Sequence, residues 1–317
     1  MYKLIRFYNQ NKKQIIKIIL IIVFVIGIIQ LLNYLVGKKN NIDNNNQINV
    51  SYENNQTSEI VSDKSLVSGQ TIASETIKKD SEIIKQFVEL CNQNNVEQAY
   101  ELLTNECKEN MFPTIDDFKR IYCYEIFNSY KTYTLENWTN STYQIRYTGD
   151  ILGTGNLNNN ETRQDYITVV NKNGEKKLNI NNYIGRNSLN RTTNYEDIKI
   201  VVTSVDIYMD YEIYNLAIQN NSNKDILLDT SNDTKSIYLL DGKEMKYYFY
   251  NNEIIENKLL IKSDFTNSLK IKFASTYSSN KKIKKIVFSK VVLDYEKYEN
   301  LENKEEYKFY QINANVN

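Results

Sequence analysis

A long apolar segment near the amino terminus constrains this chain more than any other feature. Residues 18–36 read IILIIVFVIGIIQLLNYLV, and all but four of these side chains are Ile, Leu, Val or Phe. A helix over residues 15–36 would be about 33 Å long, which matches a hydrocarbon core of about 30 Å. The run is longer than the apolar part of a signal peptide, and no small-x-small cleavage pattern follows it. We therefore expect an uncleaved transmembrane helix over residues 15–36.

The charges on either side of this segment predict its orientation. Lys3, Arg6, Lys12, Lys13 and Lys17 precede the span, whereas only Lys38 and Lys39 follow it closely. The positive-inside rule then places residues 1–14 in the cytoplasm. We expect a single-pass protein of the cell membrane with the bulk of the chain extracytoplasmic. Residues 37–75 are dominated by Asn, Ser, Gln and charged side chains, which cannot form a core, so they predict a flexible linker.

The composition excludes several classes of function. The chain has 39 basic and 39 acidic side chains among 317 residues, so no global positive charge favours nucleic-acid binding. It has no histidine, which rules out Ser-His-Asp and Cys-His catalysis and histidine-bearing zinc sites. We expect no enzyme, no cofactor and no metal. A hydrolase or isomerase that uses Asp, Glu and Tyr needs no histidine and remains an open alternative.

Helical spacing begins after the linker. Apolar residues from Ile77 to Cys91 share one face, and Val96, Ala99, Tyr100, Leu103 and Cys107 follow at the same spacing, which predicts a hairpin of two helices. Pro113 and Thr114, with Asp117 three residues on, predict the start of a third helix. That helix is expected to bury Phe118, Ile121, Tyr122 and Ile126.

The periodicity then changes from 3.6 to 2. Alternating segments over residues 133–184 predict strands, and Asn173-Gly174 predicts a two-residue hairpin turn. Residues 76–186 thus predict an α+β domain of three helices followed by a curved antiparallel sheet.

The segment FVELCNQNNVEQAYELLTNECKENMFPTIDDFKRIY resembles the helical opening of extracytoplasmic domains with the nuclear transport factor 2-like cone fold. In that fold a sheet wraps around the helices. The resemblance contains no diagnostic catalytic motif and implies no active-site residues. Such domains of bacterial membrane proteins often serve as assembly or docking modules, which is what the resemblance implies here.

Residues 194–312 predict strands only. Their spacing of about 8 to 14 residues is typical of a β-sandwich, and Leu269, Ile271 and Phe273 alternate with lysines as expected for a sheet with one wet face. Leu240-Asp241-Gly242-Lys243 predicts another tight hairpin. The Cys-Trp-Cys signature of antibody domains is absent, so only an immunoglobulin-like architecture is expected.

Few residues are candidates for a functional role. Cys91, Cys107 and Cys123 are expected to be small buried side chains; a Cys91–Cys107 bridge is out of reach in a helical hairpin, whereas a bridge from Cys123 to either stays open. The glycines at 153 and 155 predict a hairpin loop, not a phosphate loop. Asp229, Ser231 and Asp233 lack the rest of a calcium loop. The cluster Tyr247-Tyr248-Phe249-Tyr250 could contact a partner, but alternation exposes only every second ring.

The cleft of the cone-like domain is the expected binding site. Trp138, Arg146, Tyr147 and Tyr166 lie on its predicted sheet and are our candidates for lining that cleft. We expect a protein-interaction or scaffold module of the cell envelope of a low-GC Gram-positive bacterium, in an assembly such as a secretion or conjugation apparatus. Its partners would be envelope proteins. The alternative is a protein that binds a small molecule or wall glycan in this cleft.

Overall fold

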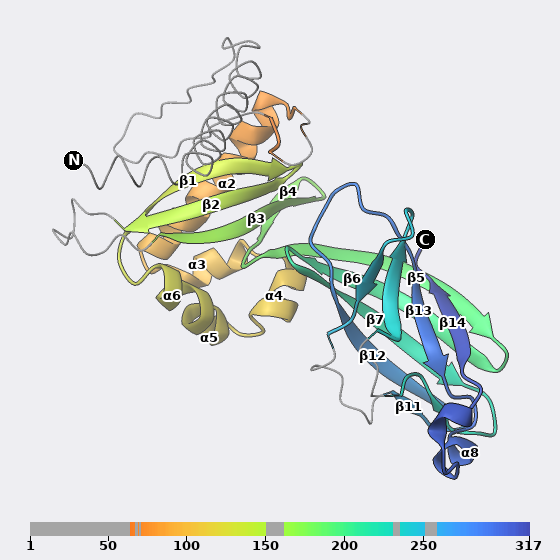
Figure 1. Ribbon diagram of the computed structural model, residues 1–317. Helices are drawn as coiled ribbons and strands as arrows, with labels where there is room; N and C mark the ends of the chain where they lie inside the picture. Colours follow the sequence, from red (N-terminus) through yellow and green to blue (C-terminus); the bar gives the residue numbers. More distant parts are fainter. Residues whose placement is uncertain (1–63, 67–68, 70, 150–161, 231–234, 251–258) are drawn as a thin grey trace, which may run out of the picture. The chain divides into compact units, whose positions relative to one another are not determined.

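The computed structural model of this chain describes residues 64–66, 69, 71–149, 162–230, 235–250 and 259–317 (Figure 1). The chain divides into two compact units, Met1–Ile48 and Asn49–Asn317, and all described residues belong to the second. The predicted transmembrane helix and most of the predicted linker lie outside the described residues. Within the described part, no helix combines the length and the apolar character needed to cross a membrane.

The described part is α+β, with antiparallel sheets. Its helical segments are α2 (Ser74–Asn92), α3 (Val96–Glu101), α4 (Asn105–Met111), α5 (Ile115–Phe118), the π-helix η1 (Lys119–Cys123), α6 (Tyr124–Ile126), α8 (Tyr295–Glu299) and the 3-10 helix η4 (Lys304–Glu306). Its strands are β1 (Lys131–Thr139), β2 (Thr142–Gly149), β3 (Arg163–Lys172), β4 (Glu175–Asn179), β5 (Tyr183–Tyr195), β6 (Ile198–Tyr208), β7 (Tyr211–Asn220), β8 (Ile226–Leu227), β9 (Ile237–Asp241), β10 (Lys246–Tyr248), β11 (Leu260–Ile261), β12 (Phe265–Ala274), β13 (Ile283–Val291) and β14 (Tyr310–Asn315).

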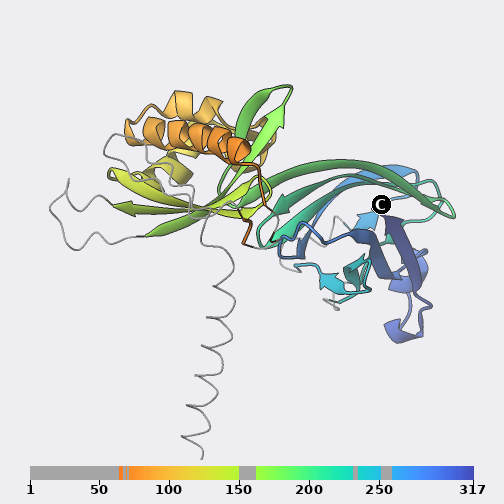
Figure 2. The ribbon, with the colours of Figure 1, turned by 90° about the horizontal axis from the view of Figure 1, so that it is seen from above.

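The first core forms between the helices and the sheet β1-β2-β3-β4 (Figure 2). Figure 2 shows α2, in orange, along one face of this sheet. The predicted stripe of α2 is confirmed, since Ile77, Ile84, Phe87 and Cys91 are buried. The amphipathic spacing stabilises this helix because its apolar face is buried against the sheet.

The predicted second helix is wrong in its length, because the structure breaks it into α3 and α4. Leu103 forms an isolated parallel bridge with Leu178 of β4, and the Leu178 N–H donates to the Leu102 carbonyl. Thr104 then caps α4 by accepting a hydrogen bond from the Cys107 N–H at 3.0 Å. The backbone at the break is thus satisfied by a distant strand, which the helical spacing could not indicate.

The third helix begins where it was predicted, with Thr114 accepting from the Asp117 N–H at 3.1 Å. It then widens into the π-helix η1. Phe118 and Tyr122 point inward and stack with ring centroids 5.8 Å apart. The prediction for Ile121 is wrong, since this side chain is 39% exposed. The wider turn of the π-helix keeps the rings of Phe118 and Tyr122 in the core and leaves Ile121 at the surface.

The predicted hairpin at Asn173-Gly174 is confirmed. Lys172 pairs with Glu175, and both turn residues have positive φ, 55° and 88°. Two positive φ values are what a type I′ turn requires, and Asn-Gly supplies them at low cost.

A second core lies between two further antiparallel sheets, ordered β12-β7-β6-β5 and β10-β9-β13-β14, which form a sandwich-like pair. Leu269, Ile271 and Phe273 of β12 are buried in it, as predicted. The predicted hairpin at residues 240–243 connects β9 and β10, with Asp241 accepting from the Lys243 and Met245 N–H groups.

The long strand β5 belongs to both cores. Its first residue, Tyr183, is buried in the first core, whereas the rest of the strand is the edge of the β12-β7-β6-β5 sheet. Tyr208 at the end of β6 also lies in the first core, with its ring 5.1 Å from that of Tyr183. The residues between the two predicted domains are therefore part of a strand.

Candidate binding pocket

The structure brings together some of the residues predicted to line a cleft. The rings of Trp138 and Tyr166 meet edge to face with centroids 5.2 Å apart. Arg146 lies on the next strand and reaches Glu136 at 3.9 Å. Tyr147 points to the other face of the sheet, where it is fully buried and its hydroxyl lies 3.0 Å from that of Tyr122. Tyr147 therefore cannot contact a ligand that the other three contact.

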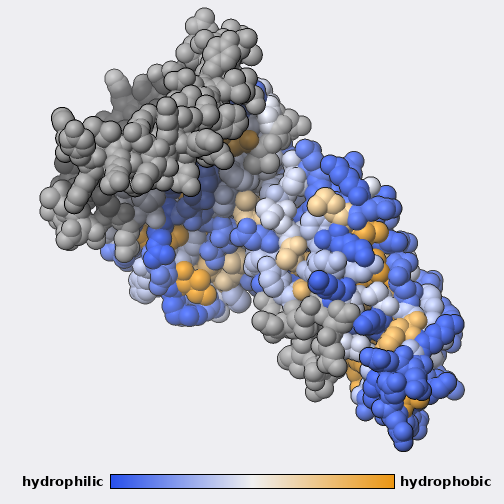
Figure 3. All heavy atoms as spheres, in the orientation of Figure 1, coloured by the Kyte–Doolittle hydropathy of each residue, from blue (hydrophilic) through white to orange (hydrophobic). Residues whose placement is uncertain are grey.

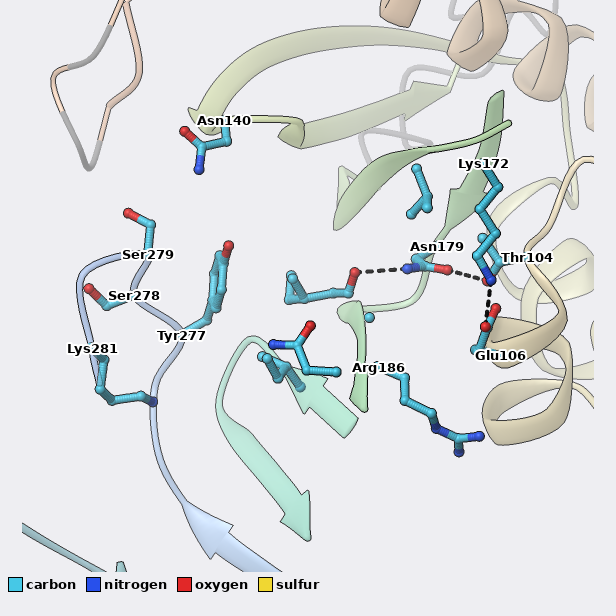
Figure 4. Close-up of a pocket in the computed structure, with 15 residues that line it drawn as sticks. Thr104, Glu106, Asn140, Lys172, Asn179, Arg186, Tyr277, Ser278, Ser279 and Lys281 are labelled. Carbon is cyan, nitrogen blue, oxygen red and sulfur yellow. Dashed lines mark hydrogen bonds and ion pairs between the residues drawn. The ribbon is translucent and has the colours of Figure 1, made fainter. Parts of the chain in front are cut away.

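A cavity of about 420 Å³ lies beside this sheet (Figure 4). One wall comes from the start of α4 and the end of β3, with Glu106 and Lys172. The opposite wall is the loop between β12 and β13, with Tyr277, Ser278 and Ser279. Figure 4 shows these two walls facing each other, with Asn140 above the loop. None of the four residues predicted from the sequence lines it.

Asn179 at the end of β4 shapes the floor of the cavity. Its Nδ2 donates to the Ile184 carbonyl at 2.8 Å, and its Oδ1 accepts from the Thr104 hydroxyl. Gly185 follows with φ +155°, and a Cβ there would lie 3.3 Å from the Asn179 Nδ2. The positive φ favours glycine at this position, and the Asn179 amide would have to shift by a few tenths of an ångström to admit a Cβ.

Each cation around the cavity has a carboxylate partner. Lys172 lies 2.5 Å from Glu106, and the Arg186 Nε donates to Asp206 at 2.7 Å. Lys281 pairs with Glu212 at 2.5 Å, and both side chains are almost fully buried. The hydrogen bond from Lys172 lowers the pKa of Glu106, and the hydrogen bond to Asp206 raises the pKa of Arg186. All of these charges are therefore held by protein partners.

The lining of the cavity includes neutral polar groups beside the paired charges. Hydroxyl and amide groups of Asn140, Ser278 and Ser279 offer neutral donors and acceptors. Burial raises the pKa of Tyr277, opposed by a hydrogen bond with Thr142, so this phenol stays protonated at neutral pH. In the described residues, no three Cys, Asp or Glu side chains form a group that could hold a metal ion.

No pattern in the sequence indicates this cavity, because its residues come from segments far apart in the chain. The loop at 153–155 lies outside the described residues, as do Ser231 and Asp233. Asp229 is buried, 2% exposed. In the tyrosine cluster Phe249 is buried and Tyr250 is 41% exposed, as alternation predicts.

Comparison with known proteins gives little similarity. No model of a known protein family matches the sequence, and no curated protein matches it. A 2.2 Å crystal structure of a conserved hypothetical protein from Bacillus anthracis aligns with a TM-score of 0.25 and 10% sequence identity, over 42% of this chain and 96% of that chain. Similarity at this level supports no conclusion about fold or function.

Proposed function

We propose that this chain is a single-pass membrane protein whose folded part lies outside the cytoplasm and binds another protein of the cell envelope, as a scaffold or docking module without catalysis. The apolar run at 18–36 and the basic residues before it support this location. A secretion or conjugation assembly is the setting that the family resemblance suggests.

The proposal includes a specific fold for each of the two parts of the chain. Residues 76–186 would have the nuclear transport factor 2-like cone fold, supported by helices packed on one face of a four-stranded antiparallel sheet. Residues 194–312 would form an immunoglobulin-like sandwich, supported by two four-stranded sheets around one core.

The observation that favours a protein partner is an apolar surface on the third helix. Ile121 and Tyr124 lie three residues apart on one helix face and are 39% and 58% exposed. We call these two residues the η1 surface. The Lys119 Nζ lies 5.8 Å from the Tyr124 ring centroid, and Arg120, which is 72% exposed, pairs with Asp117 at 3.0 Å. Figure 3 shows apolar residues, in orange, at the surface of α5 and α6.

An apolar centre with charged side chains of both signs beside it fits a protein surface that offers an apolar side chain within a polar border. Tyrosines at such centres often carry much of the binding free energy, and rim charges assist the encounter. Burying Ile121 and Tyr124 against a partner would also remove from water the most exposed apolar side chains of this helix.

Crosslinking on intact cells tests the proposal. The full-length chain is crosslinked, extracted from membranes and its captured partners identified by mass spectrometry. The double variant Ile121→Ser, Tyr124→Ser should reduce capture of a reproducible envelope protein on the order of tenfold or more.

The matched control is Phe265→Ser, which removes an exposed apolar ring, 55% exposed, from β12. It should leave capture unchanged. Equal capture by the wild type and the double variant would contradict the role of the η1 surface. Recovery of no protein partner from any variant would contradict the scaffold function.

Membrane fractionation tests the location separately. The full-length chain should stay with membranes after carbonate washing and be released by detergent. Protease added to intact cells or protoplasts should digest the folded part. Recovery of the intact chain in the soluble cytosol would contradict the proposed anchor.

The cavity favours a second candidate function, the binding of a polar small molecule or wall glycan. Its hydroxyl and amide lining and the Tyr277 ring are groups that bind sugars. Saturable thermal stabilisation by soluble wall fragments, following RT ln(1 + [L]/Kd), would support this function. A Tyr277→Phe variant should keep that response and Ser278→Tyr, which fills the cavity, should abolish it.

A further inference from the structure

Two of the three cysteines meet in the first core. Cys91 lies in the last turn of α2, and Cys123 ends η1. They are 5% and 4% exposed, and the two thiols lie close enough for each to affect the other's electrostatic environment. The aromatic rings beside them hold the same two helices together, since Phe87 and Tyr122 have centroids 6.0 Å apart. The packing of α2 against η1 therefore holds the two buried thiols near each other.

Cys107 has a different environment. It lies in α4 and is fully buried, and its sulfur interacts with the backbone of Ile180. All three cysteines lie in the described part of the chain and are free thiols, and no contact between Cys107 and another cysteine supports a bridge there. Cys107 is a natural internal control for the other two.

We propose that Cys91 and Cys123 form an intramolecular disulfide by exchange with a disulfide donor, either a dithiol oxidoreductase in its oxidised form or a low-molecular-weight disulfide. The bond would join the end of α2 to η1 and so fix the helix that carries the η1 surface. In the cell this step depends on the extracytoplasmic location proposed above, because cytosolic thiols are kept reduced.

The exchange balances with the donor as the oxidant. The thiolate of one cysteine attacks a sulfur of the donor disulfide, forms a mixed disulfide and releases one donor thiolate. The thiolate of the second cysteine then attacks the protein sulfur of that mixed disulfide and releases the other donor thiolate. The two protons of Cys91 and Cys123 pass to the two donor thiols, and the two electrons reduce the donor.

Burial decides when this step can take place. The pKa of Cys91 is raised well above its usual value, chiefly by burial, so the thiol stays protonated in the closed core. Exchange therefore proceeds while the helices are still open, during folding or in a local opening. Once formed, the bond is shielded from reductants by the same packing.

The test uses the full-length chain, purified in detergent in its reduced form and then equilibrated with oxidised glutathione. One sample is treated in native buffer and a second is refolded from denaturant in the same redox buffer, so that slow access to the buried thiols is controlled. Free thiols are alkylated with N-ethylmaleimide under denaturing conditions and located by mass spectrometry. We expect a Cys91–Cys123 linked peptide pair and alkylation at Cys107 alone.

The variants separate a specific bridge from general thiol reactivity. Cys107→Ser should form the same link as the wild type, whereas Cys91→Ser and Cys123→Ser should form no internal link. Oxidation should raise the Tm of the wild type and Cys107→Ser by roughly 5–15 °C and should not raise it in the other two. Three free thiols in both wild-type samples, or a link that includes Cys107, would overturn the proposal.

A measurement of the redox state of the cysteines in whole cells, by acid quenching and alkylation, distinguishes the disulfide proposal from the proposed extracytoplasmic location. An oxidised pair in cells supports both. A pair that is reduced in cells but forms the link in purified protein contradicts the extracytoplasmic location and leaves the cysteine pairing supported by the purified chain.

Discussion

Asp165 is a buried carboxyl group that links the sheet of the first core to a helix and a turn. Its Oδ2 accepts from the Tyr122 hydroxyl at 2.7 Å and from the Asn181 N–H at 3.0 Å. Its Oδ1 accepts from the N–H groups of Tyr166 and Asn182. Each oxygen thus satisfies two donors, which explains how a carboxyl group that is 3% exposed can stay in the core.

We predict that Asp165→Asn destabilises the protein by about 2–4 kcal/mol, measured by urea denaturation. The amide is nearly isosteric but has one oxygen, so in either orientation its NH₂ group faces at least one backbone N–H donor. The exposed acid Asp116 provides the control, since Asp116→Asn should change the free energy of unfolding by about 0.5 kcal/mol or less. An equally small change in the free energy of unfolding for Asp165→Asn would contradict a stabilising role for the hydrogen bonds of Asp165.

The same residue predicts a pH dependence. Burial raises the pKa of Asp165 above its ordinary value, partly offset by the four donors. The folded protein then holds a proton that the unfolded chain releases, so stability falls as pH rises from about 4 through the folded-state pKa. Urea midpoints of the wild type and Asp165→Asn, compared between pH 4 and 7, should show this fall in the difference between the two. A flat difference would refute it.

The candidate residues on the first sheet show what alternation in a strand can and cannot predict. Arg146 and Tyr147 are neighbours in β2, and neighbours in a strand face opposite sides of the sheet, so they could never have shared a cleft. The contact of Trp138 with Tyr166 depends on the register of β1, β2 and β3, which the sequence does not specify. The cavity could not be predicted from local pattern, because its walls come from segments that only the complete fold brings together.

At the scale of elements, the cap of α4 can be tested directly by substitution of Thr104. The Thr104 hydroxyl accepts from the Cys107 N–H and donates to Asn179, so it both caps the helix and holds the cavity floor. Thr104→Ala should cost about 2–3 kcal/mol in urea denaturation, and Thr104→Ser should recover most of it. Thr114→Ala, at the more exposed cap of α5, should cost about 1 kcal/mol. Equal costs at both caps would contradict the double role of Thr104.

The Arg186–Asp206 pair connects β5 and β6 with α4. Asp206 is 1% exposed and also accepts from Tyr183 and Asn215. Arg186 in addition donates to Glu109 on α4 at 3.0 Å. Removal of one partner would leave a charge without its main counter-ion inside the protein, which costs more than removing both.

We expect Asp206→Ala to cost about 3–5 kcal/mol and the double variant with Arg186→Ala to cost less than the sum of the two single changes. Urea denaturation of all four proteins gives the coupling free energy. The exposed pair Lys79–Glu75 is the control and should show little or no coupling. Additive costs at Arg186 and Asp206 would show that the pair does not couple the elements.

The elements that the sequence predicted correctly are those set by local pattern. The apolar stripe of α2, the Asn173-Gly174 turn and the alternation in β12 all follow from neighbours in the chain. The break between α3 and α4 depends on Leu178, far along the sequence. The polar stretch at 187–193 has no apolar alternation, and it is a strand because β6 offers it a backbone to pair with.

At the scale of the whole molecule, the two cores share the strands β5 and β6. β5 begins in one core and ends in the sheet of the other, and Tyr208 of β6 returns to the first core. We therefore predict that a chain lacking residues 1–48 unfolds in one cooperative transition. In scanning calorimetry its van't Hoff and calorimetric enthalpies should agree, whereas two separate peaks would show independent cores.

The sharing of β5 also restricts how a gene for this protein could be recombined. A crossover within residues 183–195 would leave the first core without Tyr183, or would leave the β12-β7-β6-β5 sheet with β6 as an unpaired edge. Exchange of either half with another gene would therefore yield a product with an open core or an unpaired strand. The two parts are expected to be inherited as one block, with changes in domain order confined to positions before residue 64.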